Sequence, residues 1–74
     1  MHAEIPALVA RTDLADHASY LLLTPAGRVD WVDSPVAATA FTSMREAARM
    51  AARLPAIQRA YGLPRNVEIA LHAQ

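Results

Sequence analysis

The spacing of apolar and polar residues changes several times along the chain, and these changes predict its strands and helix. Residues 19–23 carry apolar side chains on both faces, as a central strand covered on two sides does, which predicts a strand over 18–24. In the turn that follows, proline presets φ at the second position and Gly27 takes the left-handed position. Residues 28–33 alternate imperfectly, which predicts that they return as the second arm of a hairpin.

The first segment, residues 6–11, fits either a short strand or one turn of helix. We favour an edge strand, because Pro6 suits the first position of such a strand and Val9 suits a pleated sheet. At the level of sequence it is open whether this segment joins the sheet. Without it the sheet has three strands and an exposed edge, which favours a binding partner.

The middle of the chain has the pattern of a capped helix. Ser43 and Glu46 fit a capping box, in which the hydroxyl accepts from a backbone N–H and the carboxylate reaches back to the cap. Pro55 ends or kinks this helix, and Gly62 suits the end of one further turn. We therefore expect one kinked helix over about 43–61. Its apolar stripe follows helical spacing at Met44, Ala47, Ala48, Ala51 and Leu54.

Residues 67–72 alternate cleanly between apolar and polar side chains and predict a closing strand. The assembled order indicates a single small domain over 1–74 of the α+β class. We expect a two-layer sandwich, in which the kinked helix crosses one face of a mainly antiparallel sheet of three or four strands. A right-handed crossover would place the last strand beside the first. The expected core contains Leu21, Leu23, Phe41, Val67, Ile69, Leu71 and the alanine stripe.

The composition leaves little material for that core. Hydrophobic residues make up 54% of the 74 residues, but 17 of them are alanine. A chain of this size buries only about 60% of its unfolded surface, so association with a second copy or another protein is an expected way to complete the core. We see no signal-peptide pattern and no apolar run of membrane-spanning length, and we expect a cytoplasmic protein without membrane contact.

The charges are balanced overall but unevenly distributed. A net charge of zero argues against a strongly basic nucleic-acid protein and against an acidic DNA mimic. Residues 1–42 sum to −3 and residues 43–74 to +3. A ridge on the predicted helix accounts for much of the positive half, which makes its members candidate phosphate contacts. We favour the alternative of a solvated helix face with cations toward its C-terminal end. The ridge consists of Arg45, Arg49 and Arg53, with Arg59 as an extension.

Three large side chains of the hairpin are candidate contacts to a protein partner: Tyr20, Leu22 and Trp31. Exposed tryptophan often anchors an interface. We favour the alternative that Trp31 packs under the helix or over the outer face of the sheet. Tyr20 and Tyr61 are expected to be half-buried with a solvated hydroxyl.

No constellation of residues predicts catalysis, a metal or a cofactor. Cysteine is absent, which excludes disulfides and thiolate sites. Asp13, Asp16 and His17 lie within five residues, but a single loop seldom supplies the geometry of a metal site. We find no nucleophile with an oriented base and no glycine-rich phosphate loop, so we expect no enzyme and no small-molecule ligand. Catalysis stays open only for a cleft built between two copies.

The order of motifs resembles that of small uncharacterised phage and prophage proteins. In residues 18–72, a hairpin ending in Trp31 precedes the Ala38-Thr39-x-Phe41 segment, which runs into a capped alanine-rich helix and a closing strand. The resemblance implies a phage or prophage origin and brings no catalytic residue or activity. The excess of alanine, and of arginine over lysine, is typical of a GC-rich bacterial or phage genome.

Together these patterns predict a non-enzymatic protein-interaction module that docks on a host protein or on a second copy of itself. The alternative is an accessory protein that binds nucleic acid weakly through the arginine ridge.

Overall fold

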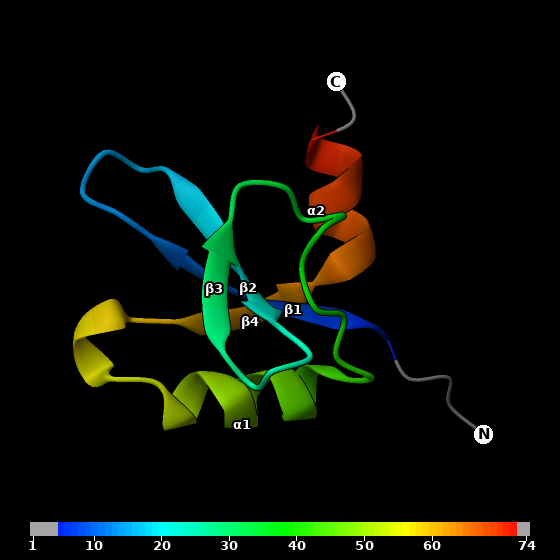
Figure 1. Ribbon diagram of the computed structural model, residues 1–74. Coiled ribbons are helices and arrows are strands. Elements are labelled where there is room, and N and C mark those ends of the chain that lie inside the picture. The colour runs from blue at the N-terminus through cyan, green and yellow to red at the C-terminus, as the bar shows by residue number, and fades with distance from the viewer. Residues whose placement is uncertain (1–4, 73–74) are drawn as a thin grey trace.

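The computed structural model describes residues 5–72, and within them four strands form one open antiparallel sheet. The strands lie in the order β3-β2-β1-β4, with helix α1 on one side of the sheet and helix α2 on the other (Figure 1). This arrangement confirms the α+β class. The elements in chain order are β1 (Ala7–Thr12), β2 (Ala18–Leu23), β3 (Val29–Val32), α1 (Met44–Arg53), the 3-10 turn η1 (Ala56–Gln58), β4 (Tyr61–Pro64) and α2 (Arg65–His72).

Strand β1 joins the sheet and lies in its interior, between β2 and β4. Four consecutive residues of β1 are buried. Ala7 and Val9 belong to the core on the α1 side, and Leu8 and Ala10 belong to the core on the opposite side. The prediction of an edge strand over 6–11 is therefore wrong, because β1 pairs with a strand on each of its edges and its apolar side chains are covered on both faces of the sheet.

A short segment before α1 fills the space where β1 and β2 diverge. The backbones of Ala7 and Phe41 exchange two hydrogen bonds, with N–O distances of 2.9 and 2.7 Å. On its other side, the amide of Thr39 donates to the carbonyl of Leu21 at 3.0 Å, and its hydroxyl accepts from the amide of Leu23 at 2.7 Å. The A-T-x-F sequence thus joins two strands that do not pair with each other at this end.

The two hairpin turns of the sheet share one geometry. Between β2 and β3, the amide of Gly27 donates to the carbonyl three residues earlier at 2.9 Å and Gly27 has a φ of 82°, as predicted. Between β1 and β2, the amide of Asp16 donates to the carbonyl of Asp13 at 3.1 Å, and Asp16 has a φ of 63°. Aspartate tolerates this left-handed conformation better than most residues other than glycine. Leu14 therefore holds the tip position that Pro25 holds in the other turn.

Helix α1 begins at the predicted N-cap. The Oγ of Ser43 accepts from the amide of Glu46 at 3.2 Å. The carboxylate of Glu46 accepts from the hydroxyl of Thr42 at 2.6 Å, so the reciprocal half of the predicted capping box is wrong. The helix ends at Arg53, two residues before Pro55, as expected where proline removes a backbone donor.

The packed face of α1 lies very close to β4. Ala47 is fully buried, and a Cβ atom added to Gly62 would lie 3.2 Å from the Cβ of Ala47. Glycine at this position therefore lets the helix approach the strand backbone. The predicted stripe is wrong at Met44 and Ala48, which are exposed. The side chains packed toward the sheet are Ala47, Met50, Ala51 and Leu54.

The predicted continuation of the helix to residue 61 is also wrong. After Leu54 the chain makes only the turn η1, which ends at Arg59 with a left-handed φ of 52°. Tyr61–Pro64 then pairs with β1 as β4. Gly62, which the sequence predicted to end a helix, belongs to this strand. Pro64 is the last residue of β4, at the edge of the sheet, where a missing backbone donor is tolerated. Because β4 is antiparallel to β1, no right-handed parallel crossover forms.

Residues 67–72 form part of α2, so the predicted closing strand is wrong. Six residues are too few to distinguish the two-residue period of a strand from the 3.6-residue period of a helix. The glutamate, alanine and leucine in this run favour a helix. In the helix, Val67 and Leu71 are 50% and 62% exposed and leave the predicted core, whereas Ile69 is half-buried. The position predicted beside the first strand is occupied by β4.

Candidate functional site

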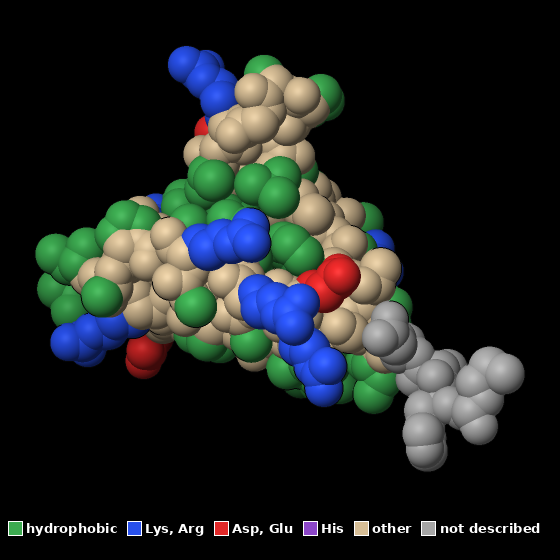
Figure 2. All heavy atoms as spheres, turned by 90° about the horizontal axis from the view of Figure 1, so that it is seen from below, with side chains coloured by type: hydrophobic (Ala, Val, Ile, Leu, Met, Phe, Trp, Pro, Cys, Tyr) green, Lys and Arg blue, Asp and Glu red, His purple; other side chains and the backbone are tan. Residues whose placement is uncertain are grey.

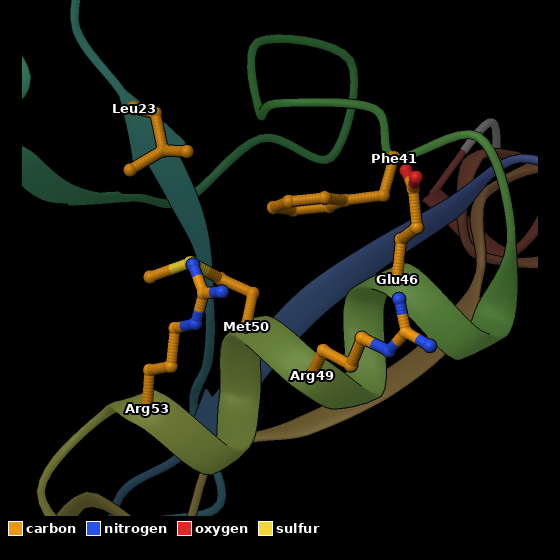
Figure 3. A pocket seen from close by; sticks show the side chains of 6 residues that line it. All are labelled: Leu23, Phe41, Glu46, Arg49, Met50 and Arg53. Carbon is orange, nitrogen blue, oxygen red and sulfur yellow. The ribbon is translucent and has the colours of Figure 1, made fainter.

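A groove lies between α1 and the part of the sheet that this helix leaves open. Helix α1 packs on β1 and β4. The end of β2 and the segment before the helix therefore form a second wall opposite α1, and the groove between them has a volume of about 290 Å³ (Figure 3). The lining residues are Leu23, Phe41, Glu46, Arg49, Met50 and Arg53.

The groove has an apolar floor and a charged rim. The apolar side chains of the two walls, Leu23 and Phe41 on one and Met50 on the other, together form what we call the floor, and all three are half-buried against the core on the α1 side. In Figure 3 the side chain of Arg53 runs beside Met50 toward Leu23, and Glu46 reaches toward Phe41. An apolar side chain placed on this floor would remove apolar surface from water on both partners.

Local structure explains how each wall is positioned. Arg49 and Arg53 are four residues apart on one helix and share its side. Phe41 is held by its backbone bridge to Ala7. Leu23 is the last residue of β2, and the segment before α1 fixes its amide. Both walls are therefore parts of the ordered fold.

The groove rim carries two positive charges and one negative charge, and its arginines form no salt bridge within the described chain. Among residues 5–72, a single salt bridge is present, between His17 Nδ1 and Asp13 Oδ2 at 3.9 Å. Glu46 at the rim accepts a hydrogen bond from Thr42. Figure 2 shows basic side chains in a row across this face, with one acidic side chain beside them and hydrophobic side chains next to the row. The groove therefore favours an anionic ligand that also carries apolar surface.

The predicted arginine ridge contributes to the groove only in part. Arg45, Arg49 and Arg53 are all exposed on α1, and the last two line the groove. Arg59 follows η1 and lines a different hollow beside the β1–β2 turn, so the predicted extension of the ridge to Arg59 is wrong.

The three predicted interface residues do not form one surface. Tyr20 is fully buried, so its place in an exposed interface is wrong. Leu22 is half-buried and lies on the same face of β2 as Tyr20. Trp31 is half-buried on the opposite face, where it packs against the core on the α1 side and pairs with Leu21. The guanidinium of Arg11 lies 4.4 Å from the ring centroid of Trp31, which covers this ring by a cation–π contact.

Tyr20 instead connects the sheet to α2. Its hydroxyl donates to Glu68 Oε2 at 2.5 Å and lies 2.9 Å from His72 Nε2. The expectation of a solvated hydroxyl is therefore wrong. Burial raises the pKa of Tyr20 above its ordinary value of 10.0, and the hydrogen bond to Glu68 and its negative charge raise this pKa further. Helix α2 contains no buried residue, so these two bonds are prominent among its contacts with the sheet.

We expect Tyr20→Phe to lower the free energy of unfolding by about 1–3 kcal/mol, because it removes a buried donor to a carboxylate. Amide hydrogen exchange in α2 should speed up more than exchange in α1. The matched control is Tyr61→Phe, which removes a bond to the hydroxyl of Thr12 at 2.9 Å from an exposed tyrosine. Equal effects of the two substitutions would contradict the role given to Tyr20.

The pH dependence of this variant has a definite sign. A pKa raised by folding contributes stability that is fully present below the ordinary tyrosine pKa of 10.0. That contribution is lost as the pH rises above 10, so the stability difference between wild type and Tyr20→Phe should shrink in alkaline solution. Chemical unfolding of both proteins at several pH values between neutral and alkaline measures this stability difference.

Sequence reasoning missed the groove and the most exposed apolar side chains. Arg49, Met50 and Arg53 could be placed on one side of a helix from their spacing alone. Nothing local in the sequence places the opposite wall beside them. Leu14 and Ile57 are almost completely exposed. The only sequence signal for Leu14 is a leucine between two aspartates in a predicted loop.

Two other classes of site find no support within residues 5–72. No three histidine, aspartate or glutamate side chains there are arranged to hold a metal ion. Neither α1 nor α2 combines the length and apolarity that crossing a bilayer requires.

Comparison of the chain with protein-family models, with curated proteins and with solved structures found no match. The resemblance to phage and prophage proteins therefore stays a prediction. The geometry of the groove is the basis on which a function can be argued.

Proposed function

We propose that this protein is a non-enzymatic protein-interaction module that binds an acidic, apolar-tipped segment in the α1 groove. The segment belongs to a partner protein or to a second copy of the chain. The observation that carries the proposal is an apolar floor bordered by Arg49 and Arg53, which form no salt bridge with residues 5–72.

Floor and rim would act together in such binding. Burial of apolar surface contributes about 25 cal/mol per Å². Isolated surface ion pairs contribute only about 0–1 kcal/mol, so the arginines alone would bind weakly. A carboxylate held at the edge of a dehydrated floor receives stronger, charge-assisted hydrogen bonds from a guanidinium. The arginines would therefore select an acidic segment, and the floor would supply most of the affinity.

Binding of nucleic acid is a second candidate, favoured by the exposed row of Arg45, Arg49 and Arg53. Three phosphate contacts supply only weak, salt-sensitive affinity. The hairpin tryptophan offers little stacking surface for a base, since Arg11 covers the ring of Trp31.

Capture of partners from a bacterial lysate tests the proposal when groove and ridge are varied separately. We expect the tagged protein to retain a partner protein with and without nuclease. The double variant Arg49→Glu/Arg53→Glu should retain about tenfold less of it, because charge reversal repels an acidic segment. Arg28→Glu/Arg45→Glu is the matched control, with the same change of charge outside the groove lining.

Each class predicts a different pattern in this comparison. Loss in both double variants, together with loss on nuclease treatment, would support phosphate contacts along the ridge instead, because each variant reverses at least one ridge arginine. Equal retention by the wild type and both variants would contradict binding in the groove.

A further inference from the structure

The β1–β2 turn carries the chemistry that the groove favours. Leu14 is fully exposed at the tip of the turn, with Asp13 and Asp16 on either side of it. The turn is ordered by its own hydrogen bonds, since Asp13 Oδ1 accepts from the amides of Ala15 at 2.8 Å and His17 at 2.9 Å. The leucine is thus presented on a fixed turn, and little conformational entropy is lost when it binds.

The fold gives no reason for a leucine at this position. The other hairpin turn has the same geometry and holds Pro25 there. Leu14 packs in neither core cluster, and the hollow that it lines is also lined by Ile57, which is 90% exposed. An apolar side chain in full contact with water on an ordered turn is a candidate anchor for a protein contact.

The charges of the turn are opposite to those of the groove. The amide of His17, and also that of Ala15, donates to Asp13 and holds the pKa of this carboxyl below its ordinary value of 3.8. Asp13 is therefore ionised at neutral pH. The groove rim carries Arg49 and Arg53 with one acid, Glu46, so its net charge is opposite to that of a leucine flanked by two acids, and its apolar floor suits the leucine.

We propose that the β1–β2 turn of one copy binds in the α1 groove of a second copy, with Leu14 on the apolar floor and Asp16 toward Arg49 and Arg53. This inference rests on the proposed function and names a second copy of the chain as the partner.

The contact joins two different surfaces, so its symmetry is that of a head-to-tail arrangement. Each copy offers one turn and one groove, and repetition of the contact gives an open chain or a closed ring. One turn in one groove is small by the standard of stable interfaces, so the association should be weak. It should weaken further as salt screens the charged pairs.

Sedimentation of two complementary variants tests the inference. The wild type should show an average mass that rises with protein concentration. Leu14→Lys and Arg49→Glu/Arg53→Glu should each stay monomeric, since one has lost the turn and the other the groove. An equimolar mixture of the two should form a two-chain complex, because the intact turn of the arginine variant fits the intact groove of the Leu14→Lys variant.

Matched variants separate this contact from general effects of charge. Pro25→Lys adds the same charge at the tip of the other hairpin, and Arg28→Glu/Arg45→Glu reverses two charges outside the groove lining. Both should assemble as the wild type does. Asp16→Gly should weaken assembly severalfold without harm to the fold, because glycine adopts the left-handed conformation of this position without strain.

Several results would overturn the inference. Assembly of Leu14→Lys to the same extent as the wild type would do so, and so would a mixture that stays monomeric. A wild type that stays monomeric up to about 1 mM would also overturn the inference, because it would exclude self-association with a Kd below about that concentration. In that case the proposed function stands if groove-dependent capture of another protein persists, and it fails if that capture is also absent.

Discussion

Leu21→Ala is expected to lower the free energy of unfolding by about 2–5 kcal/mol. Leu21 is fully buried in the core on the α1 side, together with Ala7, Val9 and Ala47. Truncation removes buried apolar atoms from this core and leaves a cavity in it. A domain of 74 residues has a total stability of roughly 4–11 kcal/mol at about 0.05–0.15 kcal/mol per residue. Urea unfolding followed by circular dichroism should show a large fall in the midpoint.

Leu14→Ala is the matched control for this substitution. The chemical change is the same, but Leu14 is fully exposed, so the free energy of unfolding should change by less than about 0.5 kcal/mol. Similar losses at the two leucines would show that the core is not packed as described.

Ala47→Leu is expected to destabilise the fold by about 1–3 kcal/mol through overpacking. Ala47 is fully buried, and its Cβ faces Gly62 of β4 at a spacing that leaves no room for further atoms. A leucine here must push α1 away from the strand or take an unfavourable rotamer. Thermal unfolding of the variant should occur at a clearly lower temperature.

Ala48→Leu gives the control on the next residue of the same helix. Ala48 is exposed, and leucine has nearly the helix propensity of alanine, so stability should stay within about 0.5 kcal/mol of the wild type. A larger loss at Ala48 than at Ala47 would mean that the helix presents a different face to the sheet.

The hairpin and the start of α1 could be predicted because their signals are local. A proline and Gly27 define one turn, and Ser43 caps the helix with its own hydroxyl. The C-terminal third could not be read in this way. Gly62 fits a helix end as well as a strand under a closely packed helix, and the choice depends on Ala47, which is distant in sequence. Whether the alternating run 67–72 forms a strand or a helix depends on the contact of Glu68 with Tyr20, which is also distant in sequence.

Only the part of the candidate site that follows from helical spacing could be predicted. The row of arginines follows from intervals of four residues. Two of them border a groove because Leu23 and Phe41 form the opposite wall. The amide of Leu23 is held by the hydroxyl of Thr39, and Phe41 is held by its backbone bridge to Ala7. No pattern within that segment indicates which strands it joins. The exposure of Leu14 likewise depends on a turn that projects from the sheet, so only the structure distinguishes it from a leucine folded back onto the core.

The position of β1 in the sheet has a consequence for how the protein is made. This interior strand is the first of the described elements, and its neighbour β4 is the last strand. During synthesis the β2–β3 hairpin can form early, but one edge of β1 stays open until β4 has left the ribosome, about 50 residues later. An open strand edge can pair with wrong partners, and contacts that close over most of a chain form slowly. The pace of translation between these two strands, rather than the strength of the finished contacts, should set how long the nascent protein is exposed to aggregation.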